Sequence, residues 1–345
     1  MERSNEATKN GERGSDWWRV LLGVGISAGL LGIVFFNVDS TELKNELLRG
    51  DYRFLLLSIL SFLASLLART VAWRALLENK ASPRRVFLTL NEGYFLNNVL
   101  PFRLGEVGRA FLLSRNSPLR FWQIVPTIMI ERAFDMLLVV SLLFVSLPFV
   151  VGVEGAAFKA AVVGGVVLLA LAGLHLLARS RVRVLGWIER LQARFPALQR
   201  LRSEQIEAFF QGLSALTDLR RFLVAFGGML AAWVLIFLYY YLALLIFVPQ
   251  AHWAWAGFSL SMVGLGVAVP SAPGQIGVVE AGLVFVLGIL GVWRAKALAY
   301  ALVVHAIYLL FTSLLGIYAL SLDGQSLASV YRQIRERSRG VKHKA

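Results

Sequence analysis

Long apolar runs alternate with short polar connections along this chain. At 1.5 Å per helical residue, a run of about 20 apolar residues crosses the roughly 30 Å hydrocarbon core of a bilayer. The runs that meet this length cover residues 17–36, 54–78, 121–152, 156–178, 222–248 and 297–320. The pattern predicts an all-α polytopic membrane protein with about six transmembrane helices.

Two further apolar segments, residues 86–113 and 257–292, are interrupted by proline and glycine. Irregular backbone at membrane depth is tolerated only where it is buried in protein or lines water. We therefore expect two re-entrant hairpins made of broken helices. The first would enter from the cytosol, because Arg84, Arg85, Arg115 and Arg120 flank it, and the second from the outside, because the loop 249–256 before it has no lysine or arginine.

The two broken segments share a layout that predicts an inverted-topology repeat. Leu100–Gly108 and Val269–Gly277 align without gaps as apolar-Pro-x-x-x-Gly-(Glu/Gln)-apolar-Gly. Paired broken segments in inverted halves indicate a binding site near the membrane midplane. The alternative is that proline and glycine simply recur in membrane helices.

We expect one transmembrane domain over residues 17–320, with halves at about 17–152 and 156–320. Residues 179–221 would form a cytosolic amphipathic connection, because apolar positions recur there at helical spacing among nine arginines. Residues 1–16 would be a disordered cytosolic tail and residues 321–345 a basic cytosolic tail. The 121–152 run is longer than one bilayer, so either it tilts or its first third lies at the cytosolic interface.

Composition supports the membrane assignment and limits the possible partners. The chain is 57% hydrophobic and 16% charged, with a net charge of +14 and a mean hydropathy of +0.66. The basic residues gather at span ends, which is typical of cytosolic loops beside anionic lipid and not of nucleic-acid binding. Membrane lipids with anionic or phosphate-bearing headgroups are the expected partners. The chain has no cysteine and only four scattered histidines, so we expect no metal site and no cofactor.

The first broken segment carries Arg103, Glu106 and Arg109. Charges at membrane depth are costly and usually mark a site. An arginine fork suits a phosphate, and Gly105 and Gly108 after Pro101 would let a headgroup approach closely. The alternative is a structural ion pair that fastens the hairpin to its neighbours.

Three further groups of residues are candidates for the same substrate-binding site. Glu131 and Asp135 would act as gating or proton-coupled carboxylates with Arg132 paired to one of them, or all three would form an interfacial charge cluster. Asn97 and Asn98 would bind a headgroup or satisfy backbone carbonyls freed by the proline. In the second segment, Gln275 replaces Glu106 in the alignment, and Glu280 is either a site residue or an exposed acid at the outer interface. Pro270, Gly274 and Gly277 would shape this segment, and His305 is expected to pack in the interior.

At these residues the chain resembles the transmembrane domain of the lysylphosphatidylglycerol synthases and their stand-alone, flippase-like relatives. The stretches that carry the resemblance are Gly93–Leu113, Glu131–Asp135 and Pro270–Glu280. In the bifunctional relatives this domain moves an aminoacylated phospholipid between leaflets, and a separate soluble domain makes that lipid. The chain ends about 25 residues after its last span, so we expect the translocation part alone, with a lipid-synthesising enzyme as a potential partner.

The resemblance implies a lipid translocase in a bacterial cytoplasmic membrane, with both termini in the cytosol. No P-loop or catalytic Ser/His/Asp arrangement occurs in the sequence, so we do not expect an enzyme. Two alternatives remain open. One is a membrane-embedded transferase acting on a lipid-linked substrate, although Arg132 between Glu131 and Asp135 opposes metal binding. The other is a non-transporting scaffold or regulator that presents the basic connection 179–221.

Overall fold

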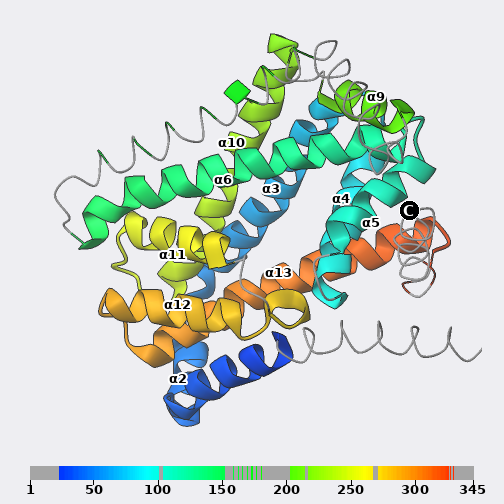
Figure 1. The fold of residues 1–345 in the computed structure, drawn as a ribbon. Helices are drawn as coiled ribbons and strands as arrows, with labels where there is room; N and C mark the ends of the chain where they lie inside the picture. The colour runs from blue at the N-terminus through cyan, green and yellow to red at the C-terminus, as the bar shows by residue number, and fades with distance from the viewer. Residues whose placement is uncertain are drawn as a thin grey trace, which may run out of the picture.

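The computed structural model describes residues 23–100, 104–151, 203–213, 217–266 and 271–325, with single positions between 158 and 180 and at 327 and 329. Throughout these residues the chain forms helices and contains no strand (Figure 1). The prediction of an all-α protein is confirmed. Three proposed site or hairpin residues, Pro101, Arg103 and Pro270, lie outside the described residues. So do the N-terminal tail and most of the C-terminal tail, of the expected span 156–178 and of the connection 179–221.

Four helices are long and apolar enough to cross a membrane. They are α3 (Leu55–Leu76), α6 (Phe121–Val151), α10 (Leu219–Phe247) and α13 (Arg294–Leu322). A helix over Gly23–Phe36 and α2 (Ser40–Arg49) bend by 83° and together make a fifth candidate. The chain is therefore an integral membrane protein, and four or five of its predicted spans fall within the described residues.

Helices α3 and α10 lie antiparallel and form the closest helix pair (Figure 1). The Ser58 hydroxyl donates to the Tyr239 carbonyl across the pair at 3.1 Å. A Cβ atom on Gly228 would lie only 3.0 Å from the Ala72 Cβ, so no larger residue fits there without displacement. Small residues let membrane helices approach closely in this way.

The ends of the long helices gather on two opposite sides of the molecule. On one side the backbone N–H of Asp51 donates to Ile246 O at 2.9 Å, and Trp293 Nε1 donates to Glu42 Oε2 at 3.3 Å. These contacts bring together the start of α3, the end of α10 and the start of α13. The turn at Tyr52–Phe54 (η1) lies on the same side.

The other side joins the remaining ends. Gln123 Nε2 donates to Gln211 Oε1 at 2.6 Å, which connects the start of α6 to α9 (Ser203–Gly212). The Arg221 guanidinium lies 3.2 Å from the Glu78 carboxylate, which connects the start of α10 to the end of α3. The end of α13 lies on this side too, where Asp323 pairs with Arg85, and the end of α6 lies on the first side, where Phe149 stacks on His252. All four long helices therefore run between the same two sides.

Each segment that the sequence marks as broken forms two helices packed against each other. The first consists of α4 (Pro83–Val99) and α5 (Gly105–Arg115). The second consists of α11 (Trp253–Gly266) and α12 (Val278–Ile289), with a 3₁₀ turn at Pro273–Gln275 (η5) before α12.

The two broken segments pack in corresponding ways. Helix α4 contacts α13 as α11 contacts α6, and α5 contacts α6 as α12 contacts α13. The aligned glycines nevertheless differ in conformation. Gly105 and Gly108 lie within α5, whereas Gly274 and Gly277 have φ angles of +69° and +90°. The shared motif thus starts a helix directly in one segment and forms a left-handed turn in the other.

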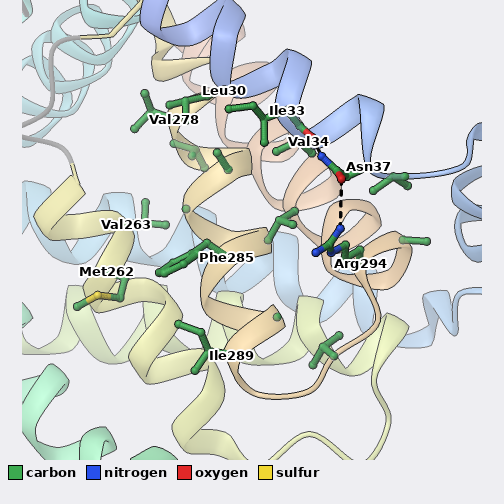
Figure 2. A pocket seen from close by; sticks show the side chains of 18 of the residues that line it. Leu30, Ile33, Val34, Asn37, Met262, Val263, Val278, Phe285, Ile289 and Arg294 are labelled. Carbon is green, nitrogen blue, oxygen red and sulfur yellow. Dashed lines mark hydrogen bonds between the residues drawn. The ribbon is translucent and has the colours of Figure 1, made fainter.

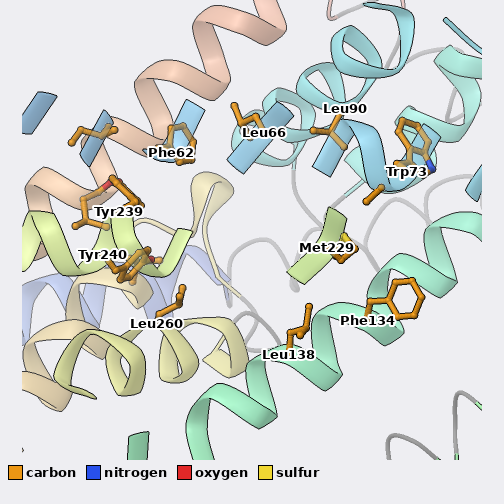
Figure 3. Close-up of a cluster of buried hydrophobic side chains, with 14 of the residues drawn as sticks. Phe62, Leu66, Trp73, Leu90, Phe134, Leu138, Met229, Tyr239, Tyr240 and Leu260 are labelled. Carbon is orange, nitrogen blue, oxygen red and sulfur yellow. The ribbon is translucent and has the colours of Figure 1, made fainter. Parts of the chain in front are cut away.

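Large side chains from α3, α6 and α10 fill a continuous core (Figure 3). Trp73, Tyr239 and Phe134 are among the largest fully buried residues. The Tyr239 hydroxyl donates to the Val304 carbonyl, so the core also holds α13 against α10. This core supports both broken segments.

Candidate functional site

Three helices bring six charged side chains together beside the first broken segment. Helix α3 contributes one arginine, α5 an acid and an arginine, and α6 two acids and an arginine. These residues are Arg69, Glu106, Arg109, Glu131, Arg132 and Asp135. We call them the charged network. Five of the six were expected site residues.

Glu131 is the centre of the charged network. Its carboxylate lies 2.5 Å from Nη2 and 3.3 Å from Nη1 of Arg109, a two-pronged contact that suits a guanidinium. Glu131 is fully buried and Arg109 is 3% exposed. The Arg109 guanidinium also lies 4.1 Å from the centre of the Trp73 ring. Arg109 is therefore enclosed and joins α5 to α6, as the structural alternative expected.

Asp135 continues the charged network toward α3 and α10. It accepts hydrogen bonds from Arg69 and, at 2.9 Å, from Trp233 Nε1. The Arg69 guanidinium also donates to the Tyr94 hydroxyl at 3.2 Å and lies 3.6 Å from Glu131. The buried charges are thus paired and hydrogen-bonded, which offsets the cost of removing them from water.

The accessible edge of the charged network is the pair Arg132 and Glu106. Their side chains are 40% and 39% exposed, and Arg132 Nε lies 3.6 Å from Glu106 Oε1. Arg132 also contacts Glu131 at 3.2 Å and Asp135 at 3.1 Å. An incoming headgroup can therefore reach Arg132 far more easily than it can reach Arg109.

The sequence did not identify several members of this site. Arg69 lies within the predicted span 54–78 but was not singled out, and neither were Trp73 and Trp233. The one signal for Arg69 was a charge within an apolar run, which is expensive at membrane depth. Glu106 and Arg109 share one helix, but each pairs with a different residue of α6.

Asn97 and Asn98 hold the tip of the first broken segment. Asn97 Oδ1 accepts the backbone N–H of Gly105 at 2.9 Å, which satisfies a donor at the start of α5. Asn98 Nδ2 donates to Thr312 Oγ1 at 2.8 Å and to Ser313 Oγ at 3.2 Å, both on α13. Their side chains therefore bind protein groups in this state.

A buried acid–base pair joins the second broken segment to α13. Glu280 Oε1 lies 2.6 Å from His305 Nδ1, and Glu280 Oε2 accepts the backbone N–H of Gly277 at 2.6 Å. Both residues are only 4% exposed. The interpretation of Glu280 as an exposed acid at the outer interface is therefore wrong, because the first turn of α12 faces α13.

The tips of the two broken segments meet against α13. A Cβ atom on Gly274 would lie 3.4 Å from the Asn98 carbonyl oxygen and 3.2 Å from Leu309 of α13. The next residue, Gln275, adopts φ = +60°, an unusual value for a side chain other than glycine. The aligned pair Glu106 and Gln275 thus occupy different surroundings, since Glu106 faces Arg132.

A cavity of about 1140 Å³ lies along α12. Its walls are mainly apolar side chains from the helix over Gly23–Phe36, from α11 and from α12 (Figure 2). Asn37 and Arg294, whose polar atoms lie 3.4 Å apart, contribute to its lining beyond the end of α12. Gln275 also lines it, just before the start of α12. The charged network and this cavity are distinct, because no member of the network lines the cavity, whereas the expected site residue Gln275 does.

A further charged cluster ties α4 to the end of α13. Arg85 lies 2.6 Å from Asp323 and 3.4 Å from Glu92, which is fully buried. The sequence did not single out these three residues. Among the described residues, no group of three or more histidine or acidic side chains is arranged to hold a metal ion.

Comparison with known protein families matches most of the chain, including nearly all of the membrane region. The sequence model of the family described as the lysylphosphatidylglycerol synthase TM region matches residues 20–316. No curated protein and no solved structure matches the chain. The family match covers both broken segments, the charged network and the Glu280–His305 pair. The chain therefore belongs to the lysylphosphatidylglycerol synthase TM region family.

Proposed function

We propose that this chain is a lipid translocase that moves a phospholipid or a lipid-linked headgroup across the bilayer. The observation that carries the proposal is the meeting of the two broken segments at Asn98 and Gly274, with the charged network beside one segment and the apolar cavity beside the other. A lipid needs both a polar route for its headgroup and an apolar route for its tails. The family match supports a role in lipid handling.

The proposed topology has two re-entrant hairpins in inverted halves. The corresponding packing of α4–α5 and α11–α12 on α13 and α6 supports it. Arg84, Arg85, Arg115, Arg120, Arg220 and Arg221 lie near helix ends on one side, which we assign to the cytosol of a bacterial cytoplasmic membrane. Both termini would then be cytosolic.

The headgroup would bind at the exposed edge of the charged network. Three guanidiniums and three carboxylates balance there, so an anionic headgroup must replace a carboxylate in order to bind. Glu106 is the acid most easily replaced, since its contact with Arg132 is long, at 3.6 Å, and exposed. A phosphate would bind Arg132 in its place, and Glu131 and Asp135 would position that arginine.

The lipid tails would use the cavity along α12. Ligand sites of this kind are concave and mainly apolar, with a few polar groups that fix orientation. Here Arg294 and Gln275 flank the two ends of α12. At 1.5 Å per residue, the 12 residues of α12 span about 18 Å, the scale of one leaflet's acyl chains.

The test is transbilayer movement of fluorescent lipids in proteoliposomes, with an anionic, a zwitterionic and an aminoacylated phospholipid compared. Arg132→Gln should abolish movement of the preferred lipid, because the glutamine amide carries no positive charge to bind the phosphate. Arg53→Gln is the matched control, since Arg53 pairs with Asp51 in an exposed contact on the opposite side of the molecule. It should move lipid at the wild-type rate.

Either of two results would contradict the proposal. Stable Arg132→Gln protein that moves lipid at the wild-type rate would remove the charged network from the pathway. A folded wild-type protein that moves none of the three lipids would favour the transferase or scaffold interpretation.

A further inference from the structure

The Glu280–His305 pair has hydrogen-bond partners on all sides that fix its proton content. His305 Nε2 lies 2.9 Å from the Gly274 carbonyl oxygen, which can only accept, so Nε2 carries a proton. Glu280 Oε2 accepts the Gly277 N–H. The remaining contact, 2.6 Å between Nδ1 and Oε1, is a hydrogen bond only if one of the two atoms carries a second proton.

The pair therefore holds two protons in this conformation. These two protons can be arranged as an imidazolium beside a carboxylate or as a neutral imidazole beside a carboxylic acid. If one proton leaves to water, a neutral imidazole has one N–H for two acceptor oxygens, so a ring lone pair faces either the carboxylate oxygen at 2.6 Å or the Gly274 carbonyl oxygen at 2.9 Å, and either contact is repulsive. The observed geometry thus requires the second proton.

We propose that Glu280 and His305 form the binding site for a coupling proton, and that release of this proton frees the turn at residues 274–277. This inference rests on the proposed lipid translocation, because coupling requires something to be moved. The site is separate from the charged network, whose carboxylates are held by arginines that do not titrate in proteins.

The helices packed around the pair bring no other charged side chain close to it among the described residues. Described residues of α11 and of the helix over Gly23–Phe36 include no charged side chain, and Glu280 is the one charged residue of α12. Helices α10 and α13 contribute Tyr239, which donates to the Val304 carbonyl, and Tyr308, whose ring stacks 6.2 Å from the imidazole. Helix α4 brings the uncharged Asn98, and α3 brings Phe62 against Tyr308.

The turn connects this proton to both parts of the proposed lipid path. The Gly274 carbonyl accepts a hydrogen bond from His305 and the Gly277 N–H donates one to Glu280, so the pair holds both ends of the turn. Between them, Gln275 lines the apolar cavity with φ = +60°, which costs energy for a residue other than glycine. Gly274 also contacts Asn98 of the first segment. Loss of the proton would release a strained turn at the junction of the two segments.

The experiment uses spin labelling of the full chain in nanodiscs. The sequence contains no cysteine, so Ile276→Cys provides a unique labelling position within the turn. The side chain of Ile276 is 44% exposed, so a label fits there. We expect the label to be immobile at low pH, where the pair holds both protons, and to become mobile as the pH rises and one proton is released. For release of one proton, the ratio of mobile to immobile label changes about tenfold per pH unit.

Glu280→Gln is the decisive variant. The glutamine amide can accept the Gly277 N–H and donate to His305 Nδ1, so it reproduces the protonated pair without a titrating carboxylate. In this variant the label should stay immobile as the pH rises through the range in which the wild-type label becomes mobile. Glu46→Gln changes a carboxylate on α2 and should leave the wild-type titration unchanged.

A wild-type label whose mobility does not change with pH would overturn the proposal. So would a Glu280→Gln protein that keeps the wild-type titration, since another group would then be responsible. His305→Gln serves as a second non-titrating variant if Glu280→Gln does not fold. Because label mobility is read without lipid movement, a titrating pair in a protein that moves no lipid would refute translocation and leave the proton site standing.

Discussion

The two broken segments stabilise buried carboxylates in opposite ways. Beside the first, Glu131 is surrounded by Arg109, Arg69 and Arg132, whose charges are permanent. In the second, Glu280 depends on His305, whose charge depends on protonation. The first arrangement can fasten helices at any physiological pH, whereas the second can change state. Similar packing on α13 and α6 therefore supports two different roles.

The largest difference between the segments should appear when each acid is removed. Glu131→Ala leaves three arginines around a buried void, and breaking a buried ion pair in this way costs about 3–5 kcal/mol. We expect this loss in the free energy of unfolding, measured by titration from a mild into a denaturing detergent. A loss below about 1 kcal/mol would mean that water reaches the arginines and the site is not enclosed.

Glu280→Ala should cost less than Glu131→Ala. His305 can lose its charge, so the variant leaves unsatisfied hydrogen-bonding groups at a cost of about 1–3 kcal/mol, and no unpaired ion. The same detergent titration measures this variant. Equal losses for the two variants would abolish the distinction between a permanent and a titratable pair.

Glycine substitutions in the two segments test how closely the backbone of each segment packs. Gly105→Ala places a Cβ atom 2.5 Å from Asn97 Oδ1 and in overlap with the Gly93 carbonyl, and such overpacking costs about 1–3 kcal/mol. Gly282→Ala in α12 is the control, because a Cβ atom there has no neighbour within 4 Å among the described residues. It should be neutral or stabilise the helix by up to about 1 kcal/mol. If both glycines tolerate alanine equally, α4 and α5 are not closely packed.

The smallest effect on stability is expected at the exposed edge of the charged network. Glu106→Gln removes a partner from a half-exposed ion pair and should change the free energy of unfolding by less than about 1 kcal/mol. It should nevertheless tighten binding of anionic lipid, since the phosphate no longer competes with the carboxylate for Arg132. Fluorescence quenching by lipids of different charge can measure this. Weaker binding would show that Glu106 contacts the headgroup directly.

The sequence predicted the helices better than it predicted their partners. Apolar run length located α3, α6, α10 and α13, and the Pro/Gly breaks located the ends of α4 and α11. The same reasoning grouped Glu106 with Arg109 because they are close in sequence. Pairing across helices depends on rotation and tilt, which a period of 3.6 residues does not fix. Arg69 and His305 therefore became recognisable only with their partners in place.

The close packing of α3 against α10 has a practical consequence for measuring conformational change in this protein. Where Gly228 meets Ala72 the two helices have no space to slide, so their backbone provides a fixed frame of reference. Leu60 and Leu67, 51% and 58% exposed on α3, are positions where a probe can be attached without entering the core. Distances measured from these positions to Ile276 would record movement of the second segment alone, so that its displacement could be followed in absolute terms.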